Sequence, residues 1–264
     1  MQKQKTKYRP AYLAVLNTNR CSGSQINPTS RPTVIRQLRF THLTSHYDPR
    51  YASDTLERVL RDPDATLTDI KPIKDDGTTT VWEITIDLHR CIIKRYNRKT
   101  PLHGIRRFFQ RSRAQNCWLQ AQALASIGIA VAPPIAWVQK KTLGLKRGSW
   151  LISKRVDGDD CHTTFENLKE GDNLLMANMV NTLVKLWRAG YSHGDLKATN
   201  ILIANGNPVL IDLDATQHHR SRFFARRGIT RDLRRFLQNW QAEPLIHQQA
   251  KTALAAYEFK LPVQ

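Results

Sequence analysis

The pattern of apolar residues changes near Asp157, and this change constrains the fold of the chain more than any other feature. Before it, β-branched and aromatic runs separated by turn signals indicate strands. We expect these strands at Thr66–Ile73, Thr79–Asp87, His89–Tyr96, Ile135–Val138 and Ser149–Val156. After it, apolar residues recur at three- and four-residue spacing, which indicates helices. This order predicts an α+β fold with two lobes and a cleft between them.

The helices expected from the same spacing flank and follow the strands. They are Ser53–Arg61, Arg106–Ile127, Asn173–Ala189, Thr230–Trp240 and Pro244–Tyr257. Two further short strands, Ile201–Ala204 and Pro208–Asp212, bracket the turn Asn205–Asn207. The chain is therefore divided into an irregular arm over 1–65 with one short helix, a β-rich N-lobe with one helix over 66–156, and a mostly helical C-lobe over 157–264.

One stretch of the C-lobe carries a pattern with chemical content. Asp195 lies on a loop between a helix and a strand, Asn200 follows five residues later, and Asp212 ends the second strand. Phosphoryl transfer needs a carboxylate to orient the attacking hydroxyl and oxygen ligands to hold Mg²⁺ on the phosphates. Lys197 could steady the transferred phosphate. The spacing HxDxKxxN, then strand, turn, strand and Asp, is that of the H-R-D-x-x-x-x-N and D-F-G segments of protein kinases.

The nucleotide-binding residues of such a fold are expected upstream. Lys94 follows three apolar residues of the third predicted strand, where a kinase places the lysine that binds the α- and β-phosphates of ATP. Gly77 lies in the preceding turn and is the candidate for a loop over the phosphates, although no GxGxxG pattern accompanies it.

The charge of the chain points to an anionic partner. The net charge is +19, and no Asp or Glu occurs between Leu88 and Val156, where fifteen Lys or Arg are found. A second basic cluster runs from Arg220 to Arg235. Nucleic acid, an anionic membrane surface and a phosphorylated substrate all fit this charge. No nucleic-acid-binding signature accompanies it, so no nucleic acid is expected.

Cysteine usage and hydropathy bear on the compartment. The four cysteines are scattered without a CxxC pair, which favours neither a zinc site nor a disulfide framework. The apolar piece Ala11–Leu16 is too short for a secretory signal, and no stretch reaches the roughly 20 residues of a membrane span. A cytoplasmic location is expected.

Several segments together resemble the lipopolysaccharide core kinases of the Kdo/WaaP group, which belong to the protein-kinase-like superfamily. They are HGDLKATNIL (His193–Leu202), LIDLDA (Leu210–Ala215), Ser112–Ala114 with Trp118, Leu124, Gly128 and Pro133-Pro134, and Arg231–Phe236. The resemblance covers roughly residues 66–240.

The resemblance implies a bilobal protein-kinase-like fold with a reduced C-lobe. It implies that Asp195 is the catalytic base, that Asn200 and Asp212 bind Mg²⁺, and that Lys94 binds ATP. The acceptor would be a heptose or Kdo hydroxyl of the anionic lipopolysaccharide core. The enzyme would then contact the cytoplasmic face of the inner membrane as a peripheral protein, with its basic residues near anionic lipid.

Two positions depart from the kinase pattern. The helix predicted over Arg106–Ile127 contains no Glu to pair with Lys94, and Gln115, Asn116 and Gln120 offer only neutral acceptors. Either Lys94 pairs elsewhere, with Asp212, or activity is weak. Asp214 stands where D-F-G has Gly, and it is either an additional metal ligand or a surface acid.

Two other functions remain open. A kinase-like enzyme could act on a protein or a small molecule, because a lysine two residues after the catalytic Asp resembles protein Ser/Thr kinases. Against this, there is no A-P-E segment, and only 52 residues follow Asp212, too few for a large substrate-binding lobe. A non-catalytic nucleic-acid-binding protein would explain the charge but not the kinase motifs.

Overall fold

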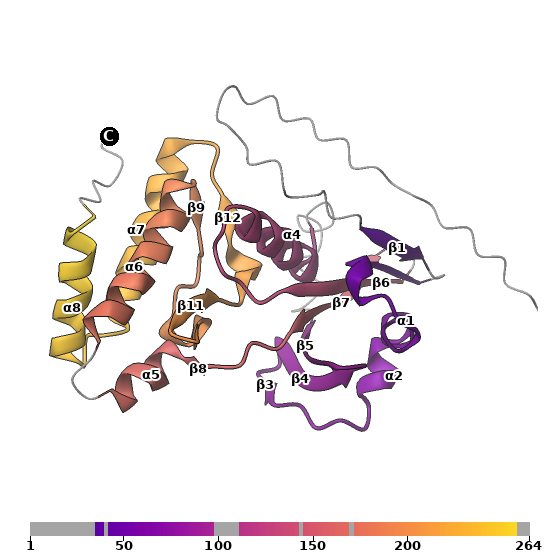
Figure 1. Ribbon diagram of the computed structural model, residues 1–264. Coiled ribbons are helices and arrows are strands. Elements are labelled where there is room, and N and C mark those ends of the chain that lie inside the picture. Colours follow the sequence, from indigo (N-terminus) through magenta and orange to yellow (C-terminus); the bar gives the residue numbers. More distant parts are fainter. Residues whose placement is uncertain (1–34, 40–41, 98–110, 143–144, 169–171, 258–264) are drawn as a thin grey trace, which may run out of the picture.

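The computed structural model describes residues 35–39, 42–97, 111–142, 145–168 and 172–257. These residues form a strand-rich half (36–154) and a helix-rich half (159–255), which lie beside one another in Figure 1. This is the α+β, protein-kinase-like architecture that the sequence predicts.

The strand-rich half is built on one antiparallel sheet of seven strands in the order β1-β2-β6-β7-β5-β4-β3. The strands are β1 (Arg36–Arg39), β2 (Leu43–Tyr47), β3 (Lys74–Asp75), β4 (Thr79–Ile86), β5 (His89–Tyr96), β6 (Pro134–Thr142) and β7 (Leu145–Lys154). Lys94 lies in β5, where it is paired with Val81 of β4 on one side and Leu151 of β7 on the other. The lysine therefore stands on an inner strand of the sheet.

Helices pack on both faces of this sheet (Figure 1). Alternate residues of each strand point to opposite faces, so Ile93 packs with the helices α1 (Asp54–Arg61) and α2 (Pro63–Leu67). Tyr96 instead packs with the helix α4 (Arg113–Ser126). The second of these cores continues from α4 into the helix-rich half, so α4 connects the sheet to the rest of the molecule.

The region before residue 66 is more ordered than the sequence predicts. The short helix is confirmed as α1, because the hydroxyl of Ser53 accepts a hydrogen bond from the backbone N–H of Leu56 at 3.1 Å and caps it. The prediction of an otherwise irregular arm is wrong for the described residues, since β1 and β2 extend the sheet from the edge of β6. A 3₁₀ turn, Pro49–Tyr51, connects β2 to α1. Residues 1–34 lie outside the described part.

The strand predicted at Thr66–Ile73 is also wrong. Asp62 accepts a hydrogen bond from the N–H of Ala65, and Pro63 occupies the first helical position, so the chain begins α2 there. Leu67 ends that helix in the core beneath the sheet.

The strands predicted at Thr79–Asp87 and His89–Tyr96 are confirmed as β4 and β5. The next two strands, predicted at Ile135–Val138 and Ser149–Val156, are longer than predicted and form β6 and β7.

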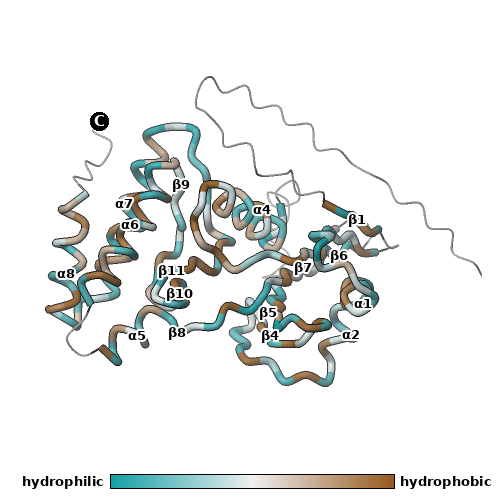
Figure 2. Tube along the Cα trace, in the orientation of Figure 1, coloured by the Kyte–Doolittle hydropathy of each residue, from teal (hydrophilic) through white to brown (hydrophobic). Residues whose placement is uncertain are grey.

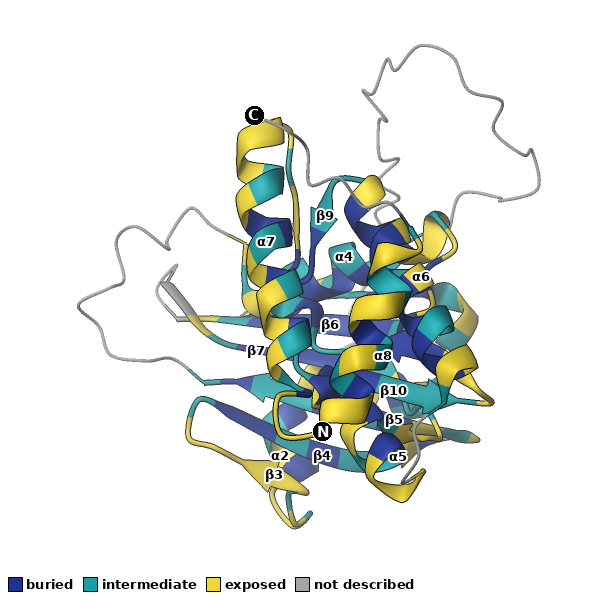
Figure 3. Cartoon of the chain, turned by 90° about the vertical axis from the view of Figure 1, so that its left-hand side faces the viewer, coloured by how far each residue is buried: buried dark blue, intermediate teal, exposed yellow. Residues whose placement is uncertain are grey.

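The helix-rich half contains four helices and several short strands in the described residues. They are β8 (Asp159–Asp160), α5 (Cys161–Asn167), α6 (Asn173–Arg188), β9 (Tyr191–Ser192), β10 (Ile201–Ala204), β11 (Asn207–Leu210), β12 (Gln217–His218), α7 (Arg222–Gln238) and α8 (Pro244–Ala255), with 3₁₀ turns at Ala198–Asn200 and Leu213–Ala215. Figure 2 shows the β10–β11 region as largely hydrophobic, and Figure 3 shows exposed residues along the outer sides of α7 and α8. The buried side of α6 forms the centre of this half.

Helix α7 begins eight residues before the predicted start at Thr230. Arginines and Gly228 obscure the apolar spacing of its first turns. Gly228 is required by packing, because a Cβ there would lie 2.8 Å from the Oγ of Ser192 in β9. Helix α4 begins at Arg113, where Ser112 caps it, and residues 106–110 of the predicted helix lie outside the described part.

Candidate active site

The loop His193–Asn200 joins β9 to β10 and is anchored by a carboxylate from α7. Asp232 accepts hydrogen bonds from the backbone N–H of His193 at 2.6 Å and of Gly194 at 2.9 Å. The indole N–H of Trp187 also donates to Asp232, at 3.4 Å. Asp232 is buried, so its charge is compensated by these donors. In the sequence, Asp232 stands within the segment Arg231–Phe236, and no local pattern predicts its role at the loop.

The same loop is tied to the segment that follows β11. The ring Nε2 of His193 lies 3.0 Å from the carbonyl oxygen of Ile211, and the hydroxyl of Thr216 donates to the carbonyl of His193 at 3.2 Å. Gly194 stands where protein kinases have Arg. Its φ is +86°, and a Cβ would lie 2.5 Å from the carbonyl oxygen of Ala215. A side chain at this position would force the loop and the following segment apart.

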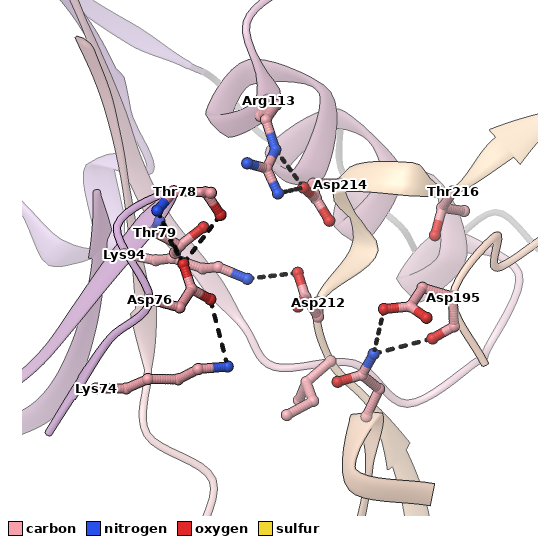
Figure 4. Close-up of polar contacts among 12 residues, drawn as sticks. Lys74, Asp76, Thr78, Thr79, Lys94, Arg113, Asp195, Asp212, Asp214 and Thr216 are labelled. Carbon is pink, nitrogen blue, oxygen red and sulfur yellow. Dashed lines mark hydrogen bonds and ion pairs between the residues drawn. The ribbon is translucent and has the colours of Figure 1, made fainter. Parts of the chain in front are cut away.

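Asp195 is the most accessible carboxylate of the site. Its side chain is 38% exposed, and the ammonium of Lys197 lies 3.1 Å from its Oδ2. The amide of Asn200 donates to the backbone carbonyl of Asp195 at 2.9 Å and reaches its Oδ2 at 3.4 Å (Figure 4). The structure therefore brings together all three residues that the loop motif singled out.

Asp212 contacts Lys94 across the two halves of the molecule. The Nζ of Lys94 lies 2.5 Å from the Oδ1 of Asp212, and both side chains are mostly buried. Burial alone would raise the pKa of Asp212, but the ammonium of Lys94 and hydrogen bonds from Asp214 and Lys94 outweigh it, so the pKa is lowered. Asp212 adopts the left-handed conformation with φ 59°, which turns the chain sharply after Ile211.

Asp214 is neither exposed nor free. Its side chain is 11% exposed, and the guanidinium of Arg113 at the start of α4 contacts its Oδ2 at 2.5 and 2.6 Å through two nitrogens. Burial and the neighbouring charge of Asp212 raise the pKa of Asp214, and Arg113 opposes that rise. Asn116 donates to the backbone carbonyl of Asp214 at 3.0 Å. The interpretation of Asp214 as a surface acid is therefore wrong, and Arg113 is a site residue that sequence analysis missed.

The partner of Lys94 is settled by the same geometry. Helix α4 supplies no carboxylate, and Cys117 is one of its residues close enough to Lys94 and Asp212 to feel their charges. Burial raises the pKa of the Cys117 thiol to about 12, so the thiol is neutral. Lys94 pairs with Asp212 instead, which was one of the two alternatives drawn from the sequence.

Gly77 lies at the tip of the turn between β3 and β4. Its φ is +71°, and a Cβ there would meet no atom within 4 Å. The turn is held by Asp76, whose Oδ1 accepts from the backbone N–H of Thr78 at 3.0 Å and of Thr79 at 2.8 Å. Figure 4 shows Asp76, Thr78 and Thr79 of this turn.

The donor set suits a magnesium ion that is shared with a substrate. Because the amide nitrogen of Asn200 faces Asp195, its oxygen is directed away from that residue and can serve as a ligand. The carboxylate of Asp212 is the second hard oxygen donor. In the part of the chain that the structure describes, no group of three or more His, Cys, Asp or Glu residues could hold a metal by itself. Mg²⁺ fits this set because it is commonly held by one or two protein groups together with phosphate oxygens.

The site has the residue pattern of protein-kinase-like phosphotransferases. A loop carboxylate is followed five residues later by an asparagine, and an aspartate follows the next pair of strands. A lysine on a strand of the other half contacts that aspartate. The model of the Lipopolysaccharide kinase (Kdo/WaaP) family matches residues 75–257, so this chain belongs to that family. Its members are lipopolysaccharide kinases, and the chain is accordingly a phosphotransferase.

The fold agrees with this assignment. The solved structure "WaaP in complex with acyl carrier protein" resembles this chain with a TM-score of 0.50 at 16% sequence identity. The likeness covers 79% of this chain and 96% of that one, and at this identity it shows the fold alone. No curated protein matches the chain by sequence.

Proposed function

We propose that this protein transfers the γ-phosphate of ATP, with Mg²⁺, to a sugar hydroxyl of the lipopolysaccharide core, on a heptose or a Kdo residue. The observation that carries the proposal is the convergence of two pairs, Lys94 with Asp212 and Asn200 with Asp195 (Figure 4). The backbone N–H of Ile211, next to Asp212, donates to the carbonyl of Asn200 at 3.0 Å and joins the two pairs. Family membership supports the lipopolysaccharide core as the acceptor.

The residues divide the work as follows. Lys94 binds the α- and β-phosphates of ATP, and Gly77 at the turn tip lets the backbone approach those phosphates closely. Asn200 and Asp212 hold Mg²⁺, which when bound neutralises charge on the phosphate oxygens. Asp195 accepts the proton of the sugar hydroxyl as the hydroxyl attacks, and Lys197 holds the transferred phosphate in line with it.

The acceptor also suggests where the enzyme works. Nascent lipopolysaccharide is an anionic glycolipid of the inner membrane, and a net charge of +19 favours approach to it. We propose that the protein is cytoplasmic and binds the cytoplasmic face of the inner membrane as a peripheral protein. No helix among the described residues is long and apolar enough to cross a bilayer.

The test is transfer of radiolabelled γ-phosphate from ATP in the presence and absence of Mg²⁺. Wild type and Asp195→Asn are compared with purified core lipopolysaccharide and with a generic basic protein as acceptors. We expect Mg²⁺-dependent label on lipopolysaccharide that falls by at least about a hundredfold in the variant. Asp159→Asn, at an exposed position of β8, is the matched control and should retain activity. Label on the basic protein but not on lipopolysaccharide would instead support the protein-acceptor alternative, and label on neither would refute the proposal.

A further inference from the structure

Two neighbouring phenylalanines are exposed at the start of α7. Phe223 and Phe224 have 68% and 59% of their surface exposed, and their rings stand edge to face with centroids 5.4 Å apart. Among the described residues, they are the two aromatic residues whose large apolar side chains are exposed. Exposing an adjacent aromatic pair to water is unfavourable unless another surface covers it.

Arginines surround this pair without acidic partners. Arg220 and Arg222 precede it, Arg227 follows it, and all three are exposed. We call these three residues together with Phe223 and Phe224 the Phe–Arg patch. From residue 215 to 242 the chain has seven arginines and a single acid, the buried Asp232 that the catalytic loop already engages. Within the described residues, no salt bridge joins any of the three patch arginines, so their charge faces solvent.

The patch continues along one side of α7. Buried residues Ile229, Asp232 and Phe236 mark the inner side of the helix. Phe223 and Arg227 are four residues apart and lie on the opposite side, where Arg231 and Arg234 follow at spacings of four and three. The outer side is therefore basic along its length and aromatic at its first turn, which is the pattern of a helix that rests on an anionic interface.

Helix α7 also fixes the distance from the Phe–Arg patch to the loop His193–Asn200. Phe224 and Asp232 are eight residues apart, which corresponds to about 12 Å along the helix axis. Asp232 holds the backbone of His193 and Gly194. A surface that bound the patch would therefore be held at a set distance from Asp195.

We propose that the Phe–Arg patch docks this protein on an anionic lipid bilayer. The two phenyl rings enter the boundary between headgroups and acyl chains, and the arginines contact lipid phosphates. A bilayer fits both features, whereas a soluble polyanion would satisfy the arginines and leave the ring pair in water. The inference rests on the proposed membrane-held acceptor, and it places that acceptor near the active site without a separate anchor.

The experiment is sedimentation of the full-length protein with vesicles, in the absence of ATP and lipopolysaccharide. Vesicles of phosphatidylglycerol and phosphatidylethanolamine are compared with vesicles of phosphatidylcholine. We expect binding to the anionic vesicles only, with an affinity that falls as salt is raised. Phe223→Ser with Phe224→Ser should weaken it about tenfold, and Arg220→Gln, Arg222→Gln and Arg227→Gln together on the order of a hundredfold.

Two control variants and one competing ligand make the test decisive. Leu88→Ser removes an exposed apolar side chain from the β4–β5 turn, and Lys251→Gln removes an exposed charge from α8. Both should bind vesicles as wild type does. Equal binding by the patch variants and wild type would overturn the proposal. So would binding of a single-stranded oligonucleotide that depends on the phenylalanines while vesicle binding does not.

The outcome is separable from that of the proposed function. Phosphate transfer to detergent-dispersed lipopolysaccharide measures the chemistry without a bilayer. Loss of vesicle binding in the patch variants, with a wild-type protein inactive on every acceptor, would support the docking surface and refute the acceptor. If the wild type phosphorylates lipopolysaccharide but the patch variants bind vesicles as well as it does, the acceptor is supported and the docking surface is refuted.

Discussion

The loop His193–Asn200 and the turn Asp212–Ala215 lie against each other, but they are held in different ways. The loop is anchored within the helix-rich half, where Asp232 accepts two backbone hydrogen bonds. The turn is anchored to the strand-rich half by two ion pairs, from Lys94 to Asp212 and from Arg113 to Asp214. In the first arrangement, the carboxylate is buried and both hydrogen bonds are formed within the helix-rich half. The second depends on charges that a nucleotide can also engage.

This difference fits the separate roles that we propose for the two segments. Backbone hydrogen bonds to a buried carboxylate set one geometry for the loop, which suits a residue that must orient an acceptor hydroxyl. The turn has two carboxylates with oppositely shifted pKa values, lowered for Asp212 and raised for Asp214. Its charge balance therefore responds to phosphates, metal and pH.

Breaking the loop anchor should have the largest effect. Asp232→Ala leaves the buried N–H of His193 and the partly buried N–H of Gly194 without their acceptor. We expect a loss of about 3 kcal/mol in the free energy of unfolding. Urea denaturation measures it, and phosphate transfer should fall with it. Asp159→Ala, at an exposed carboxylate, is the control and should change stability little. Wild-type stability in Asp232→Ala would show that the anchor is dispensable.

Removing the ammonium at the turn should reduce activity with less effect on folding. Lys94→Met removes the charge that keeps the pKa of Asp212 low and that we propose binds phosphate. We therefore expect kcat/KM for ATP to fall on the order of a hundredfold. Steady-state kinetics with varied ATP measure it. Lys154→Met, on the neighbouring strand β7 and exposed, should behave as wild type. A variant that retains full activity would remove Lys94 from the site.

The second ion pair should contribute less, because Arg113 acts through Asp214. Arg113→Gln should lower activity about tenfold, and Arg113→Lys should restore little, since one ammonium cannot reproduce the two-nitrogen contact. Arg111→Gln, two residues earlier and exposed, is the matched control. A double-mutant cycle with Asp214→Asn isolates the pair. Additive losses would mean that the two residues act independently.

The smallest effect is the pH dependence of the two carboxylates, which should have opposite signs. The lowered pKa of Asp212 means that its stabilisation is present at neutral pH and is lost as pH falls through that value, below its ordinary range. The raised pKa of Asp214 means that its ionised form weakens the fold at neutral pH, and that this is relieved as pH falls through a higher value.

Urea unfolding from about pH 7 to about pH 3 separates these contributions. The stability difference between wild type and Asp212→Asn should shrink at the acidic end. The difference between wild type and Asp214→Asn should shift in favour of wild type, beginning at a higher pH. Parallel curves for the two variants would contradict the opposed assignments.

The sequence predicted those parts of the site that a local sequence pattern marks. Asp195 and Asn200 are close in the chain, and Lys94 follows an apolar strand whose period is plain, so spacing placed them correctly on the fold. Their catalytic and binding roles remain predictions. The pairing of Lys94 with Asp212 was foreseen as an alternative because the helix offers no Glu.

The missed features depend on contacts between distant segments. Asp232 lies 39 residues from His193, and Arg113 lies 101 residues from Asp214, so neither pairing has a local signal. Strand β2 was missed for another reason. It has five residues, and its buried side includes Ser45 as well as Leu43 and Tyr47, which weakens the alternation that predicts a strand.

The most direct test of the whole account is mass spectrometry of the core oligosaccharide after incubation of lipopolysaccharide with ATP, Mg²⁺ and the enzyme. We predict one added phosphate on a heptose or Kdo residue with wild type and none with Asp195→Asn. A core that gains no phosphate from a folded wild-type enzyme would contradict the account, as would equal phosphorylation by the variant.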